Sequence, residues 1–200
     1  MTEVIWTVIM YICGSIPFSF IIPYWVKGVD VRKVGSGNVG ATNAFRVSGW
    51  KVAIMCIVMD CCKVLVPLVI LQLAFHPEKP LLLASSIAGV VGHDFSIFLR
   101  FRSGKGVAST MGVFFALNPI AGSIFLGSSL LLFAKTRLVS LSTMSGMVLA
   151  TISSLFLFSD LSYFFLFLGL TLLSIFRHKK NIQRLIKGEE KRLTEKKKNP

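Results

Sequence analysis

The stretch VASTMGVFFALNPIAGSIFLGSSLLLFA, residues 107–134, decides how many times this chain crosses a membrane. It carries no charged residue, and Asn118-Pro119 interrupts it. A helix needs roughly 20 apolar residues to cross the hydrocarbon core of a bilayer. The stretch is therefore either one kinked helix or two short helices that meet at the Asn-Pro pair.

The composition of the whole chain indicates a membrane protein. Of its 200 residues 54% are hydrophobic and only 16% are charged, which is too apolar for an ordinary soluble domain. The formal net charge is nevertheless +13. This charge is confined to short loops and the C-terminal tail, as in membrane proteins that are oriented by basic loops, so we do not expect nucleic acid as a partner.

Long apolar runs predict helices along most of the chain. They lie at residues 4–26, 52–75, 81–99, 107–134 and 138–176. The last run is long enough for two helices, and Ser159-Asp160 in its middle predicts a helical hairpin.

The distribution of Lys and Arg favours two helices in 107–134. Seven spans with the N-terminus outside place 20 of the 22 Lys and Arg residues on the inner side, whereas a single span over 107–134 gives 8 inside and 13 outside. Basic residues prefer the cytoplasmic side. We therefore predict an all-α integral membrane protein with seven transmembrane helices and a cytoplasmic C-terminus. A helix over 107–117 is only about 16 Å long, so it begins below the headgroup level or is shielded by its neighbours.

The predicted domain organisation is simple. Residues 1–190 are expected to form one polytopic transmembrane domain, and residues 191–200 a basic, disordered cytoplasmic tail.

A glycine-rich loop follows the first span, KVGSGNVGATNAFR at residues 33–46. Gly35-x-Gly37-x-x-Gly40 has the spacing of a dinucleotide-binding fingerprint, and Asp60 follows at a suitable distance. That fingerprint works only within a βαβ unit, which a loop between two membrane spans cannot provide. We therefore expect no nucleotide cofactor.

The same loop is suited to another anion. Its glycines allow backbone N–H groups to converge, and Arg46 adds a planar fork that fits phosphate or carboxylate. Neutral donors accompany it at Ser36, Asn38, Thr42 and Asn43, next to Gly37. The alternative is a plain tight loop, with Gly for the turns and Ser and Asn as caps.

A second cluster, GHDFSIFLRFRSGKGVAST, covers residues 92–110. Gly104-Lys105-Gly106 immediately precedes a predicted helix, and a helix N-terminus beside a lysine is suited to phosphate. His93 and Asp94 are adjacent and do not face each other on a helix, so we predict no catalytic dyad, although His93 is a candidate for lining the site. The alternative is a basic loop at the lipid surface.

The third cluster, RHKKNIQRLIKGEE, covers residues 177–190 where the last span ends. His178 and Asn181 are three residues apart and share a helix face. The alternative is a basic exit helix that touches anionic lipid headgroups. In the second span, Asp60 and Lys63 also share a face, either as a structural pair or in support of the site.

No metal site is predicted. The cysteines lie in apolar segments without metal-ligand spacing, and we expect them to be reduced and packed; they are Cys13, Cys56, Cys61 and Cys62.

The predicted topology brings all three clusters to the inner face. Together they provide Arg46, Lys105, Arg177 and His178 with few opposing carboxylates. This favours a site for phosphorylated molecules at the cytoplasmic surface. A transporter for small phosphorylated anions is the alternative, although transporters usually have internal repeats and a site near the midplane. A lipid-binding scaffold without catalytic activity is a third possibility.

Over essentially its whole length the chain resembles the bacterial acyl-phosphate-dependent glycerol-3-phosphate acyltransferases, the PlsY family. The stretches that carry the resemblance are DVRKVGSGNVGATNAFR, VGHDFSIFLRFRSGKGVAST and FRHKKNIQRLIKGEE, with weaker matches at DCCK and KTRLVSL. The chain departs from the family pattern at a few positions, namely Val39, Val64, Asp94, Ser96 and Ser103.

The resemblance implies transfer of a fatty acyl group from acyl phosphate to the 1-hydroxyl of sn-glycerol 3-phosphate. Lysophosphatidic acid and phosphate are the implied products, in the first step of phospholipid synthesis. The implied catalytic residues are Ser36, Arg46, Lys105, His178 and Asn181. The implied substrate-binding residues are Gly37, Asn38, Thr42, Asn43, His93, Gly104, Gly106 and Glu190.

The resemblance also implies where the protein works and with which molecules. It implies a multi-pass protein of the bacterial cytoplasmic membrane whose active site faces the cytoplasm. The expected partners are glycerol 3-phosphate, acyl phosphate and membrane lipids, with no cofactor, and a monomer is expected.

Overall fold

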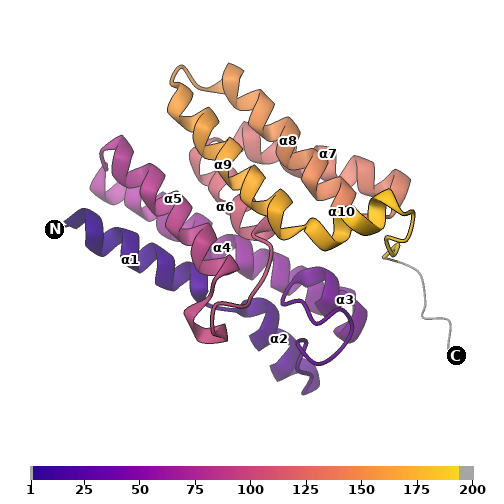
Figure 1. Ribbon diagram of the computed structural model, residues 1–200. Coiled ribbons are helices and arrows are strands. Elements are labelled where there is room, and N and C mark those ends of the chain that lie inside the picture. Colours follow the sequence, from indigo (N-terminus) through magenta and orange to yellow (C-terminus); the bar gives the residue numbers. More distant parts are fainter. Residues whose placement is uncertain (1, 194–200) are drawn as a thin grey trace, which may run out of the picture.

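The chain is helical throughout the part that the structure, a computed structural model, describes, which is residues 2–193 (Figure 1). The helices of the N-terminal half are α1 (Thr2–Ser15), α2 (Phe18–Lys27), α3 (Ala41–Ser48), α4 (Trp50–Phe75), α5 (Lys79–Asp94) and the 3₁₀ turn η1 (Ile97–Leu99). Those of the C-terminal half are α6 (Val107–Leu117), α7 (Pro119–Thr136), α8 (Val139–Leu157), α9 (Leu161–Arg177) and α10 (Lys179–Ile186).

Several helices are suited to a membrane, which confirms the predicted all-α multi-pass membrane fold. Within residues 2–193, five helical segments are long and apolar enough to cross a bilayer, and a sixth results if the bent pair α9 and α10 is one span. Helix α6 is apolar but has only 11 residues. The count of seven spans stays a prediction, because it requires α6 to count as one.

The stretch 107–134 forms two helices, as predicted from its Asn-Pro pair. Asn118 ends α6, and its side-chain oxygen accepts hydrogen bonds from the N–H groups of Ile120 and Ala121 at 2.9 and 3.2 Å. Pro119 occupies the first position of α7, where its missing N–H costs nothing. The Asn-Pro pair therefore stops one helix and starts the next.

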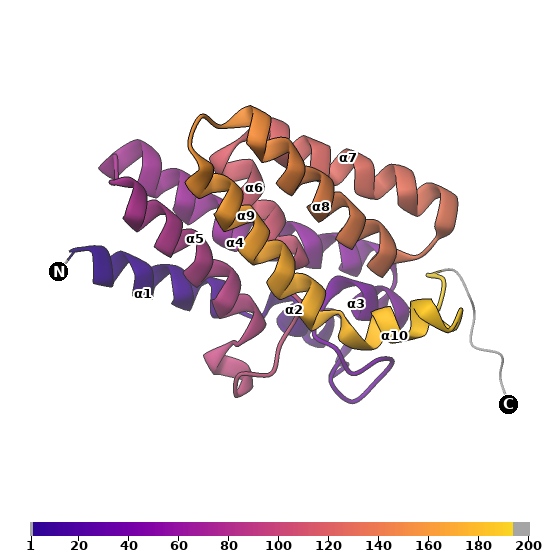
Figure 2. The same cartoon turned by 45° about the horizontal axis from the view of Figure 1, so that its top comes forward.

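Helix α6 lies at the centre of the molecule, between α4 and α5 on one side and α7 to α9 on the other (Figures 1 and 2). Its Phe114 is fully buried and stacks on Phe167 of α9, with ring centroids 4.2 Å apart. Phe125 of α7 meets the same ring edge-on at 6.0 Å. Neighbouring helices shield α6, so its short length does not expose backbone groups to lipid.

The first apolar run, predicted as a span over 4–26, is a candidate span over Glu3–Lys27. It breaks at Ile16–Pro17 into α1 and α2. Carbonyl groups at the break accept from two polar side chains: Lys63 donates to Ile16 O at 2.7 Å, and Ser96 donates to Ser15 O at 2.6 Å. The bend thus provides acceptors for polar groups inside the bundle.

Small residues let α1 and α5 pack backbone to backbone. A Cβ atom on Gly14 would occupy the place of the Gly89 carbonyl oxygen, and one on Gly92 would occupy that of the Tyr11 carbonyl oxygen. Such close approach is the usual way in which helices associate within a membrane. This packing fixes the end of α5, which carries His93 and Asp94.

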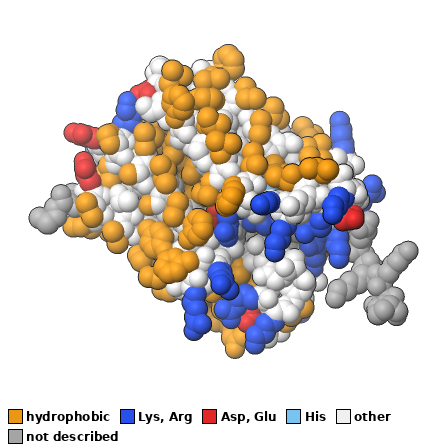
Figure 3. All heavy atoms as spheres, in the orientation of Figure 1, with side chains coloured by type: hydrophobic (Ala, Val, Ile, Leu, Met, Phe, Trp, Pro, Cys, Tyr) orange, Lys and Arg blue, Asp and Glu red, His pale blue; other side chains and the backbone are white. Residues whose placement is uncertain are grey.

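Charge is distributed unevenly over the surface. In Figure 3, Lys and Arg side chains gather at the end of the molecule that carries α2, α3 and α10, whereas hydrophobic side chains cover much of the remaining face. At the opposite end, Lys79 and Asp160 form an exposed ion pair. The N–H of Leu193 donates to Arg137 O at 3.0 Å, and residues 194–200 of the predicted tail lie outside the described residues.

Candidate active site

Groups from all three sequence clusters meet at the cationic end of the bundle. The ammonium of Lys105 donates a hydrogen bond to Asn181 Oδ1, which joins the second cluster to the third. The charge of Arg46, from the first cluster, is close enough to act on the pKa of Lys105. Residues that lie far apart in the sequence therefore share one site.

Side chains of α9 hold the Gly104-Lys105-Gly106 loop by hydrogen bonds to its carbonyl groups. Arg177 donates to the Gly104 carbonyl at 2.7 Å and to the Ser103 carbonyl at 3.2 Å, and Ser174 Oγ donates to the Lys105 carbonyl at 3.1 Å. The carbonyls thus point toward α9. The first N–H groups of α6, which have no partner within a helix, remain available to an anion.

Lys105 is partly buried, and burial is the largest cause that lowers its pKa, to about 8. The positive charges of Arg184, Arg177 and Arg46 lower this pKa further, while the carboxylate of Glu190 opposes them. Near pH 7 the ammonium is charged but crowded by other cations. A phosphate that enters this site would relieve that repulsion.

Glu190 ties the loop after α10 to the site. Asn181 donates to its Oε1 at 2.5 Å, Ser140 donates to the same oxygen at 2.7 Å, and Arg184 donates to Oε2 at 2.7 Å. Burial alone would raise the pKa of Glu190, but these three hydrogen bonds outweigh it and hold the pKa below its usual value. Glu190 therefore stays ionised and orients Asn181 toward Lys105.

His178 lies at the bend between α9 and α10 and is 4% exposed. Its Nδ1 is 2.8 Å from the Ser174 carbonyl, so Nδ1 carries the proton and Nε2 keeps its lone pair. Burial, and next the charge of Lys105, lower the pKa of His178 to about 4. The ring is neutral near pH 7, and Nε2 is able to accept a proton.

The first loop is shaped by Asn43. Its amide donates to the carbonyls of Val31 and Val34 at 2.8 and 3.1 Å, and its Oδ1 accepts from the Ser36 N–H at 2.8 Å. Both amide hydrogens are thus used within the loop. Asn43 has the geometry of a residue that positions Ser36, and the structure gives it no amide hydrogen left for a substrate.

The other predicted residues of this loop are more exposed than Asn43. Ser36, Gly37 and Arg46 are exposed, while Asn38 and Thr42 are partly buried. Gly37 has a φ of +71°, which an L side chain rarely adopts. The donors of Ser36 and Arg46 are therefore open to solvent, in contrast to those of Asn43.

His93 lies beneath the phosphate loop. Its Nε2 occupies the place that a Cβ on Gly104 would need, and its Nδ1 lies 2.9 Å from Lys63 Nζ. A lysine ammonium has no acceptor, so Nδ1 accepts and the ring proton is on Nε2, facing the loop. His93 thus joins the buried pair of Asp60 and Lys63, 2.8 Å apart, to Gly104.

Gly106 closes the loop in a left-handed conformation, with a φ of +72°, above the carboxylate of Asp94. Asp94 is 0% exposed, and neither of its oxygens has a hydrogen-bond partner in the described part of the chain. The nearest cation is Arg177, whose Nε lies 4.0 Å from Oδ2.

Two serines that contribute to the site were also not among the predicted site residues. Ser140 holds Glu190, and Ser174 holds both His178 and the carbonyl of Lys105. Ser140 lies within KTRLVSL, residues 135–141, so the sequence held a signal for it. Ser174 lies inside an apolar helix, where nothing distinguishes it. Among residues 2–193, no group of three or more His, Cys, Asp or Glu is arranged to hold a metal ion.

Sequence comparison assigns most of the chain to one family. The family model for glycerol-3-phosphate acyltransferase matches residues 4–188. A glycerol-3-phosphate acyltransferase of Pseudothermotoga lettingae is 45% identical over 184 residues, which cover 92% of this chain and 90% of that protein. Glycerol-3-phosphate acyltransferase 2 of Thermotoga maritima is 43% identical over 183 residues, which cover 92% of both.

Solved structures agree with this assignment. The crystal structure of PlsY (YgiH), an integral membrane glycerol 3-phosphate acyltransferase, in its glycerol 3-phosphate form matches with a TM-score of 0.90 at 34% identity, covering 96% of each chain. Its lysophosphatidic acid form matches with a TM-score of 0.89 at 33% identity, covering 96% of this chain and 95% of that one. The chain belongs to the glycerol-3-phosphate acyltransferase family.

Proposed function

We propose that the protein transfers a fatty acyl group from acyl phosphate to the 1-hydroxyl of sn-glycerol 3-phosphate. The products are lysophosphatidic acid and inorganic phosphate. The observation that carries this proposal is the convergence of Lys105, Arg46 and the neutral His178 at one end of a membrane bundle. The names of the relatives and the two forms of the solved PlsY support it.

The first step is to hold two anions side by side. The Lys105 ammonium and the N–H groups that open α6 bind the phosphate of the acyl donor. Arg46 and the Ser36 loop, together with Asn181, bind glycerol 3-phosphate. An acyl phosphate is already activated, so positioning and electrostatic stabilisation account for most of the catalysis.

In the chemical step, the 1-hydroxyl oxygen forms a bond to the acyl carbon, and the bond from that carbon to the phosphate oxygen breaks. The negative charge that develops on the acyl oxygen and on the leaving phosphate is stabilised by Lys105. The hydroxyl proton passes either to His178 Nε2 or to the leaving phosphate. Either proton transfer balances the reaction, and the His178→Ala variant distinguishes the two. If this variant is slower but keeps the acidic limb of the pH–rate profile, the leaving phosphate accepts the proton.

We place the protein in the bacterial cytoplasmic membrane with the site facing the cytoplasm. The support is the positive-inside rule, since 20 of 22 Lys and Arg residues fall on one side of a seven-span topology. That topology counts α6 as a span that its neighbours shield. We also propose that the active unit is a monomer.

A single assay separates the enzyme from a transporter and from a non-catalytic scaffold. Purified protein in detergent is incubated with palmitoyl phosphate and labelled glycerol 3-phosphate, and the lipid fraction is analysed for labelled lysophosphatidic acid. An acyltransferase makes this product without a second compartment, whereas a transporter or scaffold does not. Absence of product in the presence of both substrates would overturn the proposal.

A further inference from the structure

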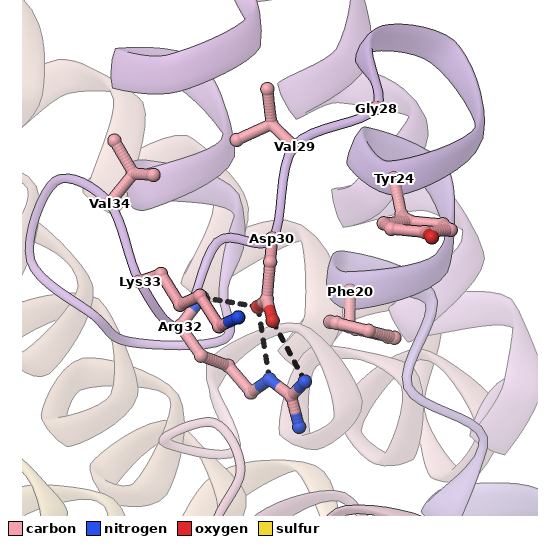
Figure 4. Close-up of a pocket in the computed structure, with 8 residues that line it drawn as sticks. All are labelled: Phe20, Tyr24, Gly28, Val29, Asp30, Arg32, Lys33 and Val34. Carbon is pink, nitrogen blue, oxygen red and sulfur yellow. Dashed lines mark hydrogen bonds and ion pairs between the residues drawn. The ribbon is translucent and has the colours of Figure 1, made fainter.

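A hollow opens beside the active-site loop, between α2 and the segment that follows it (Figure 4). It has a volume of about 630 Å³. One wall is aromatic, where Phe20 and Tyr24 stack with centroids 5.9 Å apart. The opposite wall is polar. The lining residues are Phe20, Tyr24, Gly28, Val29, Asp30, Arg32, Lys33 and Val34.

The polar wall carries an excess of positive charge. Arg32 donates to both oxygens of Asp30, at 3.0 and 2.8 Å, and its guanidinium lies 4.6 Å from the centroid of the Phe20 ring. The hydrogen bond from Arg32 lowers the pKa of Asp30 to about 2, and the charge of Lys33 adds to this effect. Asp30 is therefore ionised and already bonded, which leaves Lys33 as the cation that an incoming anion meets.

The hollow lies at the level where lipid headgroups begin. Lys27 ends the first membrane span, and before it Trp25 is 81% exposed and Tyr24 is 52% exposed. Exposed aromatic rings at the end of a span typically mark the membrane–water interface. Phe20 lies seven residues before Lys27, about 10 Å deeper along the helix. The hollow thus extends from charged residues to an apolar ring at acyl-chain depth.

We propose that this hollow binds an anionic glycerophospholipid of the surrounding leaflet, with its phosphate at Lys33 and its glycerol and upper acyl chain along Phe20 and Tyr24. The charge excess favours an anion, and the aromatic wall favours an amphiphile over a free ion. A juxtamembrane lysine contributes about 1 kcal/mol to the binding of anionic lipid, which is about fivefold in affinity.

The lipid site is joined to the active-site loop through the side chain of Asn43. Val34 lines the hollow, and its carbonyl accepts from Asn43, whose Oδ1 accepts from the Ser36 N–H. Lipid that packs on Lys33 and Val34 steadies this turn and with it the Ser36 loop. Bound anionic lipid therefore lowers the KM for glycerol 3-phosphate, with a smaller effect on kcat. This effect on activity rests on the proposed function.

The proposed lipid binding is tested without any activity measurement. The full chain, purified in neutral detergent, is titrated with dioleoylphosphatidylglycerol or dioleoylphosphatidylcholine, and retained lipid is measured by native mass spectrometry. We expect tighter binding of phosphatidylglycerol and an approximately fivefold loss in Lys33→Gln. Lys51→Gln, which removes another exposed cation next to the same loop, serves as the matched control and should bind as the parent does.

Several outcomes would overturn the lipid site. Equal retention of the two lipids, or equal losses in the Lys33 and Lys51 variants, would show only general attraction to a basic surface. Competition by millimolar inorganic phosphate as strong as that by the lipid would indicate a free-anion site. Retention that falls in Tyr24→Ala as well as in Lys33→Gln supports the two-walled site, whereas an unchanged Tyr24→Ala contradicts it.

The effect of bound lipid on activity is tested in lipid nanodiscs with and without phosphatidylglycerol. We expect the anionic lipid to lower the KM for glycerol 3-phosphate severalfold in the parent and in Lys51→Gln, but not in Lys33→Gln, whose activity in phosphatidylcholine stays unchanged. If the parent made no product in either lipid, the proposed function would fail while the binding result stood. If it were active but insensitive to the lipid, the coupling would be refuted.

Discussion

Lys63 is buried and Lys105 is partly buried within the same bundle, but their surroundings differ. Lys63 donates at 2.7 to 2.9 Å to three partners, the Ile16 carbonyl, Asp60 and His93, and its side chain is 2% exposed. Lys105 is partly buried and has one partner of its own, Asn181. An ammonium has three hydrogens. All three donors of Lys63 are therefore used, whereas Lys105 uses one of its donors for Asn181 and can offer the others to a ligand.

The difference separates a structural lysine from a binding lysine. The surroundings of Lys63 contain a carboxylate, a carbonyl and a ring nitrogen, all of which the protein supplies. Burial is the main cause that lowers the pKa of Lys105 to about 8; the charges of three arginines lower it further, and Glu190 opposes them. A site that brings cations together without enough carboxylates is incomplete until an anion enters it. The following predictions test this contrast.

The largest expected effect is on stability. Lys63→Met leaves Asp60 buried and without its cation, and breaking a buried pair by removing one partner costs about 3–5 kcal/mol. We expect a large drop in the thermal unfolding midpoint in detergent. The double variant Lys63→Met with Asp60→Leu should recover much of the loss, because it leaves no unpaired charge.

If the double variant were as unstable as Lys63→Met alone, the unpaired carboxylate would not be the cause. Poor packing of the substituted side chain would then account for the loss, and the contrast between the two lysines would lose its electrostatic basis.

Removal of Lys105 should have a large effect on turnover and a small one on stability. Lys105→Ala takes away the charge that stabilises the developing phosphate and oxyanion, and loss of one such group typically reduces kcat by about 10²–10³-fold. The thermal midpoint should stay the same or rise, because the cost of burying the ammonium disappears together with its repulsion by Arg46, Arg177 and Arg184. Initial rates with palmitoyl phosphate and a melting curve measure both quantities.

The matched control is Lys179→Ala, which removes an exposed lysine at the start of α10. It should retain both activity and stability. Near-normal turnover in Lys105→Ala would remove Lys105 from the site.

Arg46→Lys tests whether the first loop contributes shape in addition to charge. A lysine keeps the positive charge but cannot make the paired hydrogen bonds of a guanidinium to phosphate. Hydrogen bonds to charged groups contribute about 1.5–3 kcal/mol, so we expect kcat/KM for glycerol 3-phosphate to fall about 10-fold to 100-fold. Arg137→Lys, at the end of α7, serves as the control. An unchanged kcat/KM in Arg46→Lys would rule out paired hydrogen bonds from Arg46 to the phosphate.

Much of this fold could be predicted from local sequence, since apolar runs and breaker pairs mark the helices. The division at Asn118-Pro119 is one example, because both residues act on their own neighbours. The bend at Pro17 is different. Pro23 lies inside α2 and Pro67 inside α4 without ending either helix, so a proline in an apolar run is no sufficient signal. At this bend Lys63, far along the chain, donates to the Ile16 carbonyl, a contact that the local sequence does not reveal.

The candidate site shows the same limit. The convergence of Lys105, Arg46 and His178 could be anticipated because topology places their loops on one face. The role of each side chain could not be read from its type. Asn43 resembled a substrate donor, but the turn before it takes both of its amide hydrogens. Ser140 is 50 residues from Glu190 in sequence, and only the packing of α8 against α9 brings them to 2.7 Å.

The smallest expected effect is a shift in pH dependence. With the pKa of Lys105 at about 8, its ammonium is lost as the pH rises through that value, so kcat/KM should fall on the alkaline side. Glu190→Gln keeps an oxygen that can accept from Asn181 and Ser140 but removes the negative charge that raises this pKa. The alkaline limb should therefore move to lower pH.

Glu189→Gln provides a matched control, since Glu189 is the exposed neighbour of Glu190 in the same turn. Its pH profile should follow that of the parent, because the charge it removes does not face Lys105. A limb that stays in place in Glu190→Gln would mean that another group sets it. A limb that moves equally in both variants would mean that the net charge of the surface, and not the carboxylate bonded to Asn181, controls the proton on Lys105.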